Sequence, residues 1–436
     1  MKAKALLLFV LFACMPTVYS FGQVDCTTST KLVCEFPFSA QYLANNSVGG
    51  TAFLNAINGA ATPINISIAT QLTQLPVPSA SVGVVTIRDK GSDVGHPFDN
   101  LGPILTDRPD TVGRKHLFIG SSFQEFNFNA LDGVNLGSLL VGFTYSQNAP
   151  APNQSDIQTF YGGDTNTITF QLNQYAEMAT YGLTNRTDVS LVVPINQISL
   201  RVTSYGFQSY FYDSASNQYV NVLPVEAPPS LSSKGTATGI GDVTVSLKQL
   251  LLGSEGSRTA VSAGFGMRFP SGDALNYLGS GAFGGNLYGL FEYRWKVAPH
   301  LKLSYQWNGT SQLMNLSAPA NTTRLPGGLQ YDGGADIRIS RPLTLAVDLL
   351  GNQFVNTPSF TLTTNPAQHT TSPPAPYSSY ITVSHPPNTY TTVNFSSGLK
   401  YSLGKHFLVY GNVLIQANNV GLRSEPVPLF GLAYKR

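Results

Sequence analysis

Apolar and polar residues alternate with a period of two along many segments of this chain, and this alternation constrains its fold more than any other feature. Within residues 285–297, one face carries Leu287, Gly289, Phe291, Tyr293 and Trp295, and the other carries Glu292, Arg294 and Lys296. Residues 243–248, 261–269, 301–308, 343–349 and 395–403 alternate in the same way. Successive side chains of a β-strand point to opposite sides of the sheet, so each segment is predicted to be a strand.

The polar faces of these segments carry unusually little charge. Charged residues make up 11% of the 436 residues, against roughly a quarter in an ordinary soluble domain. A soluble β-sandwich also alternates, but its polar faces carry many more Lys and Glu residues. Low charge is typical of strands that face lipid on one side and a polar interior on the other. The net charge is +2 and Lys and Arg do not cluster, so we expect no nucleic-acid partner.

No apolar run after the N-terminus reaches the length of about 20 residues that a membrane helix needs. In a bilayer, only helices and closed sheets satisfy every backbone hydrogen bond. The predicted fold is therefore all-β, a closed antiparallel transmembrane β-barrel in the lipid bilayer of a bacterial outer membrane.

Links between the predicted strands alternate in length. Short links are expected near 130–135, 181–187, 252–257, 297–300, 340–342 and 403–406, and long links near 89–113, 147–165, 206–239, 270–284, 309–326, 353–389 and 417–425. Outer-membrane barrels have short periplasmic turns and long outer loops. The pattern predicts about 14 strands (12–16), with the first near Val82–Arg88, a bulge near Pro194–Asn196, and both termini in the periplasm.

The N-terminus has the features of a signal peptide. Lys2 and Lys4 precede an apolar stretch from Ala5 to Met15, and small residues favour cleavage after Ser20, or after residue 22. The predicted organisation is a signal peptide at 1–20, an N-terminal segment at 21–80, and the transmembrane barrel at 81–436.

The N-terminal segment contains a short predicted helix near 63–75. Thr62 is the expected N-cap and Pro63 the first helical residue. The residues Ile64, Ile68, Leu72 and Leu75 recur at helical spacing and form the expected apolar face. The helix belongs either to a periplasmic appendage that docks a partner or to a plug that enters the lumen from the periplasmic side.

Cys26 and Cys34 are the candidates for a disulfide. Two nearby cysteines in an exported chain most often pair with each other, and the alternative is two free thiols. No histidine lies near them, so metal binding has no support.

Two further sets of residues follow from the strand pattern. The first set is the expected aromatic belt at the membrane interface: Tyr293, Trp295, Trp307, Tyr401 and Tyr434. The second set is the charged residues on inward faces, which we expect to line the lumen: Lys248, Arg268, Glu292, Arg294, Lys302, Asp336, Arg338, Asp348 and Lys400. Glu292 beside Lys302 is an expected cross-strand pair, which either fixes strand register or contributes to selectivity.

Several strings resemble a known family of barrels, the phenol meta-pathway or aromatic-degradation transporters. They are YGLTNRTDVS at 181–190, GIGDV at 239–243, FPSGD at 269–273, LGSG at 278–281 and LGPILTDR at 101–108. The resemblance spans about residues 76–436. This group is similar to the long-chain fatty-acid transporter superfamily. The resemblance implies a barrel of about 14 strands with an N-terminal hatch that passes hydrophobic or aromatic compounds.

No motif of a known catalytic site is present: there is no Gly-x-Ser-x-Gly, no His-Glu-x-x-His, and no phosphate-binding string. The six histidines are scattered, with His300 and His406 expected in short turns and His369 and His385 in a Pro-rich loop. We therefore expect no enzyme activity, no catalytic or metal site, and no cofactor.

The leading functional hypothesis is a channel for passive uptake of small hydrophobic solutes. The alternatives are a non-specific porin, or a structural or adhesive protein that acts through its long loops. The outer-membrane assembly machinery is another expected partner. It recognises an aromatic residue at the C-terminal end of a barrel, and Tyr434 is the candidate here. Lys435 and Arg436 follow it and depart from that pattern.

Overall fold

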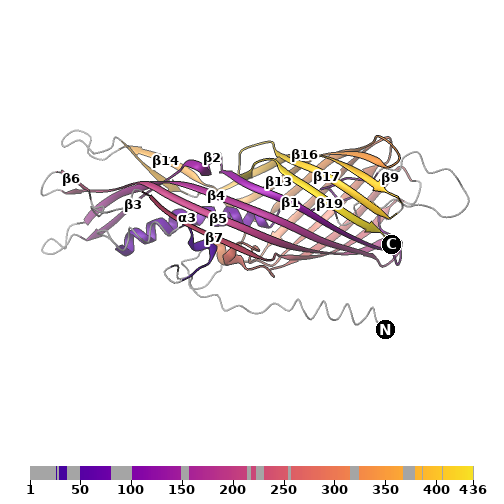
Figure 1. Ribbon diagram of the computed structural model, residues 1–436, viewed down its shortest axis with the longest axis horizontal. Helices are drawn as coiled ribbons and strands as arrows, with labels where there is room; N and C mark the ends of the chain where they lie inside the picture. The colour runs from indigo at the N-terminus through magenta and orange to yellow at the C-terminus, as the bar shows by residue number, and fades with distance from the viewer. Residues whose placement is uncertain are drawn as a thin grey trace, which may run out of the picture.

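The structure, a computed structural model, contains one closed antiparallel β-barrel (Figure 1). It describes residues 26, 29–36, 50–79, 101–148, 157–213, 218–221, 230–253, 257–314, 324–366, 379–384, 386–404 and 406–435. The expected signal peptide lies outside these residues, and so do His369, His385 and the strand expected near Val82–Arg88.

The helical elements are η1 (Leu32–Cys34), α3 (Gly50–Leu72), η2 (Leu136–Ser138), η3 (Ala274–Asn276) and η4 (Gln312–Met314). The strands are β1 (Leu117–Leu131), β2 (Val134–Asn135), β3 (Leu139–Asn148), β4 (Ile157–Gly182), β5 (Thr187–Asp213), β6 (Gln218–Asn221), β7 (Ser230–Ile240), β8 (Val243–Leu252), β9 (Thr259–Phe269), β10 (Gly284–Tyr293), β11 (Val297–Asn308), β12 (Gly328–Arg338), β13 (Leu343–Pro358), β14 (Thr361–Pro366), β15 (Ser379–Ser384), β16 (Pro387–Leu403), β17 (Phe407–Gln416), β18 (Leu422–Ser424) and β19 (Val427–Lys435).

The described residues form a barrel wall of 12 antiparallel strands. Around the wall the order is β1, β4, β5, then β7 with β8, then β9, β10, β11, β12, β13, β16, β17 and β19. β19 pairs with β1 from Phe118↔Lys435 to Gln124↔Leu429, and this pairing closes the barrel. The predicted fold class is confirmed, with a strand number at the lower end of the predicted range.

The short link predicted at 130–135 leads from β1 to the two-residue strand β2 and does not join two neighbouring strands of the wall, which explains part of the difference from 14 strands. β1 and β3 lie one after the other along the same neighbour, β4, with pairs Phe128↔Phe170 and Leu139↔Asn166. Asp132 and Gly133 both have positive φ, 47° and 81°, and form a tight turn. After this turn, β3 continues alongside β4 in the same direction as β1. β1 and β3 therefore count as one strand of the wall.

β7 and β8 also share one neighbour, β5, and they meet at a bulge. The pairs are Gln197↔Thr238 for β7 and Leu191↔Val245 for β8, which differ by one residue in register. The bulge predicted within β5 at Pro194–Asn196 is therefore wrong, because it lies opposite, at residues 241–242. Pro194 has no N–H to donate, and its carbonyl accepts from Gly241 N at 2.8 Å, so the ladder breaks at this point.

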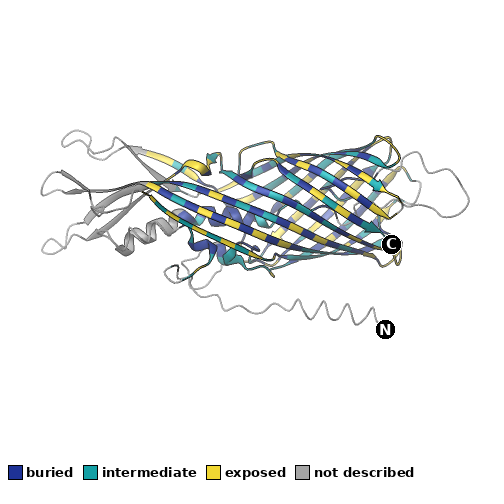
Figure 2. Cartoon of the chain, in the orientation of Figure 1, coloured by how far each residue is buried: buried dark blue, intermediate teal, exposed yellow. Residues whose placement is uncertain are grey.

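The alternation of the sequence becomes an alternation of burial in the strands (Figure 2). Leu287 and Leu303 point outward and are 59% and 56% exposed, whereas Leu290 and Ser304 on the same strands point inward and are buried. Such a band of exposed apolar side chains around a closed barrel is the surface that faces lipid. Among the described residues, no helix is long and apolar enough to span a membrane.

The barrel has two different ends. At the short-turn end, the turns at 183–186, 294–296 and 339–342 join neighbouring strands, and the chain finishes β19 there (Figure 1). At the long-link end, β3, β4, β5 and β6 extend beyond the wall as a projecting sheet. The link predicted at 353–389 contains structure as well, because β13 continues to Pro358 and β14 pairs with β15.

α3 lies at the long-link end and enters the barrel (Figure 1). The helix begins at Gly50, so the predicted start at Thr62 and Pro63 is wrong, and Pro63 lies inside the helix. It ends at Leu72, shortly before Pro76 and Pro78. Ile64 and Ile68 are buried, but so are Asn65 and Ser67 between them. All of residues 61–70 except Thr62 are buried, because β3, η4, β13 and β18 lie against α3.

Candidate functional site

The barrel lumen contains two segments that precede β1. The first is the end of α3 with residues 73–79, and the second is residues 101–116, called the strap below. Leu101, Ile104 and Val112 of the strap are buried. The prediction that 89–113 is an outer link is therefore wrong for the strap, which lies against inward-facing side chains of the wall near the short-turn end.

Polar side chains of the wall hold the strap backbone. Lys400 Nζ donates to the carbonyls of Leu101 (3.1 Å) and Pro103. Lys248 Nζ donates to Arg108 O at 3.0 Å. Near the short turns, the Val112 N–H donates to Asp188 Oδ2 at 2.9 Å. These bonds satisfy carbonyls and N–H groups that lie outside any sheet, which a buried irregular segment requires.

An ion-pair cluster joins the strap to β10 and to the short turn that follows it. Arg108 Nη2 lies 2.6 Å from Asp110 Oδ2 and 3.4 Å from Glu292 Oε1. Arg294 pairs with Asp110 and lies 3.8 Å from Glu292. The side chains of Glu292 and Arg108 are 0% and 7% exposed, so each charge depends on its partners for stabilisation.

The pairing of Glu292 with Lys302 predicted from the sequence is not found. Lys302 Nζ lies 3.9 Å from Asp332 instead, and Glu292 stands opposite His300 in the β10–β11 register. The cation that pairs with Glu292 is Arg108 and not Lys302. Arg108 belongs to the strap, and strand alternation alone does not predict its position in the lumen.

His300 is buried within β11, so the prediction that it lies in a short turn is wrong. The turn lies at 294–296, and β11 already begins at Val297. His300 Nε2 lies 2.6 Å from Asp348 Oδ1, and its Nδ1 lies 3.4 Å from Asp336 Oδ2. His406, in contrast, is exposed in a short turn as expected, with its Nδ1 3.0 Å from Lys435 O.

The nine predicted lumen residues thus occupy different levels of the interior. Lys248, Glu292, Arg294 and Lys400 surround the strap, and Asp336 and Asp348 flank His300. Arg338 is half-buried at the end of β12. Arg268 lies towards the long-link end, where it donates to Thr73 O at 3.0 Å and to Asn308 Oδ1 at 2.7 Å. Arg108, Asp110, Asp188 and His300 also lie in the lumen, although the strand pattern did not predict them there.

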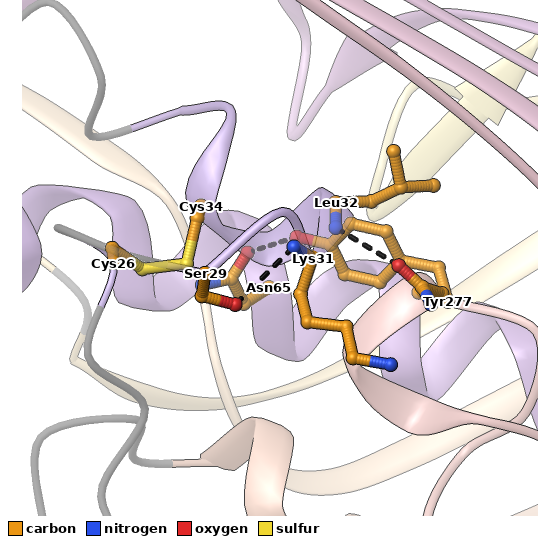
Figure 3. The surroundings of a disulfide bond; sticks show 8 residues. Cys26, Ser29, Lys31, Leu32, Cys34, Asn65 and Tyr277 are labelled. Carbon is orange, nitrogen blue, oxygen red and sulfur yellow. Dashed lines mark hydrogen bonds between the residues drawn. A yellow bond between two sulfur atoms is a disulfide. The ribbon is translucent and has the colours of Figure 1, made fainter.

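The disulfide loop (residues 26–36), the β9–β10 loop and α3 contact one another at the long-link end, and Figure 3 shows the surroundings of the disulfide. The predicted disulfide Cys26–Cys34 is confirmed, and it closes the loop that carries η1. Lys31 Nζ lies 2.6 Å from Asp273 Oδ2, and the Leu32 N–H donates to Asn276 Oδ1 at 3.1 Å. The Tyr277 hydroxyl donates to Asn65 of α3, and burial raises the pKa of Tyr277 above its usual range, so the hydroxyl keeps its proton.

The β9–β10 loop (residues 270–283) therefore folds inward over the lumen. Asp242, at the bulge, accepts hydrogen bonds from both the N–H (2.8 Å) and the hydroxyl (2.5 Å) of Ser280. Asn196 donates to Leu278 O at 2.8 Å. The bulge thus positions two polar side chains that attach this loop to the wall.

A small cavity lies between this loop, the end of α3 and the bulge. Its volume is about 100 Å³, below the roughly 300 Å³ of pockets for drug-sized ligands. Leu72, Leu75, Val77, Val192, Pro194 and Leu278 supply apolar lining, and Gln174, Asn196, Asp242, Thr244 and Arg268 supply polar groups. The lining of the cavity is therefore mixed, apolar in part and polar in part.

The five predicted belt aromatics differ in exposure. Trp295, Trp307 and Tyr401 are 41%, 37% and 47% exposed. Tyr293 and Tyr434 are half-buried, and Tyr434 packs beside Phe407 with ring centroids 5.1 Å apart. Arg258 lies over the Trp295 ring at 5.1 Å, a cation–π contact at the short-turn end.

Within the described residues, no group of three or more His, Cys, Asp or Glu side chains is arranged to hold a metal ion.

Several solved structures are similar to this chain at low identity. An outer membrane channel from Pseudomonas putida F1 matches with 13% identity and a TM-score of 0.42, over 75% of this chain and 98% of that one. A Pseudomonas aeruginosa FadL homologue matches with 8% identity and a TM-score of 0.27, over 73% and 88%. The CymD monoaromatic hydrocarbon channel matches with 10% identity and a TM-score of 0.25, over 74% and 88%.

No curated protein matches the sequence significantly. A family model described as "Putative MetA-pathway of phenol degradation" matches residues 147–420, which is well over half of the chain. The match covers the wall from the end of β3 to the segment after β17, including the bulge and the inward-folded loop. The chain belongs to this family of phenol-degradation MetA-pathway proteins.

Proposed function

We propose that this protein is a plugged outer-membrane channel for the passive uptake of small hydrophobic or aromatic compounds, and that it is not an enzyme. The observation that carries the proposal is the mixed cavity beside α3, whose apolar lining comes from α3, the β9–β10 loop and β5 and whose polar lining includes Asp242 and Arg268. A pocket of this kind binds an apolar body and orients it through a few polar groups.

The filled lumen argues against the non-specific porin. An open porin needs a continuous water-filled pore, whereas buried side chains of α3 and of the strap fill this interior at both ends. General passage of sugars or salts would require the strap to leave its ion pairs with the wall.

The bulge supports a route for an apolar solute. Val192 and Pro194 line the cavity on β5, next to the point where the ladder to β7 and β8 breaks. A local break in the wall lets strands separate at a lower cost than a continuous ladder does. We infer that solutes leave the cavity sideways into the bilayer here. The barrel orientation that we propose puts the short turns in the periplasm and the long links outside.

The test uses two neighbouring residues on opposite faces of β5. Val192→Phe fills the cavity, whereas Val193→Phe adds the same volume to the lipid face. We expect Val192→Phe to lower uptake of radiolabelled toluene by cells at least fivefold, and Val193→Phe to leave it unchanged. Proteoliposomes should swell only slowly in sugars. Equal toluene uptake with and without the protein, or fast sugar swelling, would refute the proposal.

A further inference from the structure

The N-terminal segments follow one direction along the barrel axis. The disulfide loop (residues 26–36) contacts β7 and the β9–β10 loop at the long-link end. Next along the chain, Thr73 is held by Arg268, and the Ser79 N–H donates to Ile104 O of the strap at 3.0 Å. The strap then ends at the short turns, where the Lys115 N–H donates to Gly182 O at 2.8 Å and β1 begins. The chain therefore passes through its own barrel.

We propose that this barrel carries its own N-terminal segment across the outer membrane and displays the disulfide loop on the cell surface. The inference rests on the orientation in the proposed function, with the short turns in the periplasm. A precursor reaches the outer membrane from the periplasm, whereas the loop ends at the opposite end of the barrel. The disulfide loop must therefore cross the bilayer, and the end of α3 with residues 73–79 lies in the lumen between that loop and the strap.

The distribution of charge along the chain supports this path independently. There is no Asp, Glu, Lys or Arg between Glu35 and Arg88. The strap, in contrast, carries Asp107, Arg108, Asp110, Arg114 and Lys115. Moving a charged side chain through a low-dielectric region is costly, and an uncharged polar chain crosses at a much lower cost. Lys31 and Glu35 of the disulfide loop are the charged residues that cross with it, the residues between Glu35 and Arg88 are uncharged, and Arg108 and Asp110 of the strap stay paired with the wall.

The disulfide loop is built to stay at the long-link end. Its bond joins residues 8 positions apart with a Cα–Cα distance of 5.2 Å, so the loop is compact. Leu32 and Val33 are buried against the mouth of the barrel, and Glu35 bonds Ser233 on the inward face of β7. Thr30, between the two cysteines, is exposed. The loop anchors the threaded segment and presents one side to solvent.

The experiment reads the location of the cysteines in intact cells. In a full-length Cys14→Ser variant, Cys26 and Cys34 are the remaining cysteines. Cells are treated with a membrane-impermeant reductant and a large maleimide reagent, and labelling is read as a gel shift before and after outer-membrane permeabilisation. A second variant, Thr30→Cys with Cys26→Ala and Cys34→Ala, tests the exposed position directly. Heat-modifiable mobility on a gel verifies that each variant is folded.

Two control variants in the Cys26→Ala, Cys34→Ala background, also carrying Cys14→Ser, separate the possible failures. Arg324→Cys lies on a long link and Arg341→Cys on a short turn, and both residues are exposed. The expected result is full labelling of the loop cysteines and of Arg324→Cys in intact cells, and labelling of Arg341→Cys only after permeabilisation. If Arg324→Cys is labelled in intact cells but the cysteines of the disulfide loop are not, the proposed crossing of the N-terminal segment is overturned and the proposed orientation of the barrel stands. Labelling of Arg341→Cys alone in intact cells overturns the orientation and the threading together.

Discussion

Arg108 of the strap lies 3.4 Å from Glu292 of β10, a contact between residues 184 positions apart in the sequence. Both side chains are buried, and Arg294 and Asp110 complete the cluster. This pair attaches the segment that fills the lumen to the wall that surrounds it, so it is the natural place to loosen the plug.

Replacing one member of this pair should destabilise the plug more than replacing both. Glu292→Gln leaves the Arg108 charge without its wall partner, and breaking a buried pair on one side costs about 3–5 kcal/mol. The double variant Arg108→Met with Glu292→Gln should recover part of that loss. The measurements are the temperature of the heat-modifiable transition and the single-channel conductance in planar bilayers. Equal losses in the single and double variants would show that the pair does not hold the strap.

Lys400 should hold the strap against the wall through its hydrogen bonds. Lys400→Met removes the donor to the Leu101 and Pro103 carbonyls, and a buried carbonyl left without a partner costs about 1–3 kcal/mol. We expect more frequent channel openings and greater sensitivity of cells to bulky antibiotics. Lys296→Met is the matched control, because Lys296 is exposed at a short turn. A similar change in both variants would argue for a general charge effect.

Gly182 should tolerate no side chain, because the strap passes directly over it. A Cβ at this position would meet Gly113 O at 1.9 Å, whereas a Cβ at Gly289 would meet nothing within 4 Å. Gly182→Ala should therefore displace the strap and lower the unfolding transition, by about 1–3 kcal/mol as in other overpacked sites. Gly289→Ala should be neutral. Trypsin cleavage at Arg114 or Lys115 would report the displacement, and resistance equal to wild type would contradict it.

Asp242 should control the closure of the long-link end. Asp242→Ala removes the acceptor for the Ser280 N–H and hydroxyl, and leaves Arg268 without its carboxylate at 3.6 Å. The β9–β10 loop should become mobile, which is measured as faster amide hydrogen exchange in peptides covering 270–283. Asp273→Ala is the comparison, because it removes the contact with Lys31 and the bonds to Leu275 and Asn276 at η3 but keeps the attachment to the wall, so its effect should be confined to residues near η3. Unchanged exchange in Asp242→Ala would show that other contacts hold this loop.

The sequence by itself determined the character of the wall. Leu287, Leu303 and Leu399 face lipid as their alternation predicts, because neighbouring residues of any strand point to opposite sides. The same local rule indicated the inward faces of β9 to β13 and β16, and spacing alone suggested the disulfide between Cys26 and Cys34. These features depend on residues close together in the chain.

Only the tertiary structure decided how the lumen is filled. Arg108 meets Glu292, and Lys400 meets Leu101, across 184 and 299 residues, and no local period records such contacts. His300 looked like a turn residue until the register of β11 placed it between Asp336 and Asp348. The merging of β1 with β3 along β4 likewise depends on which strand lies alongside. Alternation indicates which way a side chain points, whereas packing decides what it meets there.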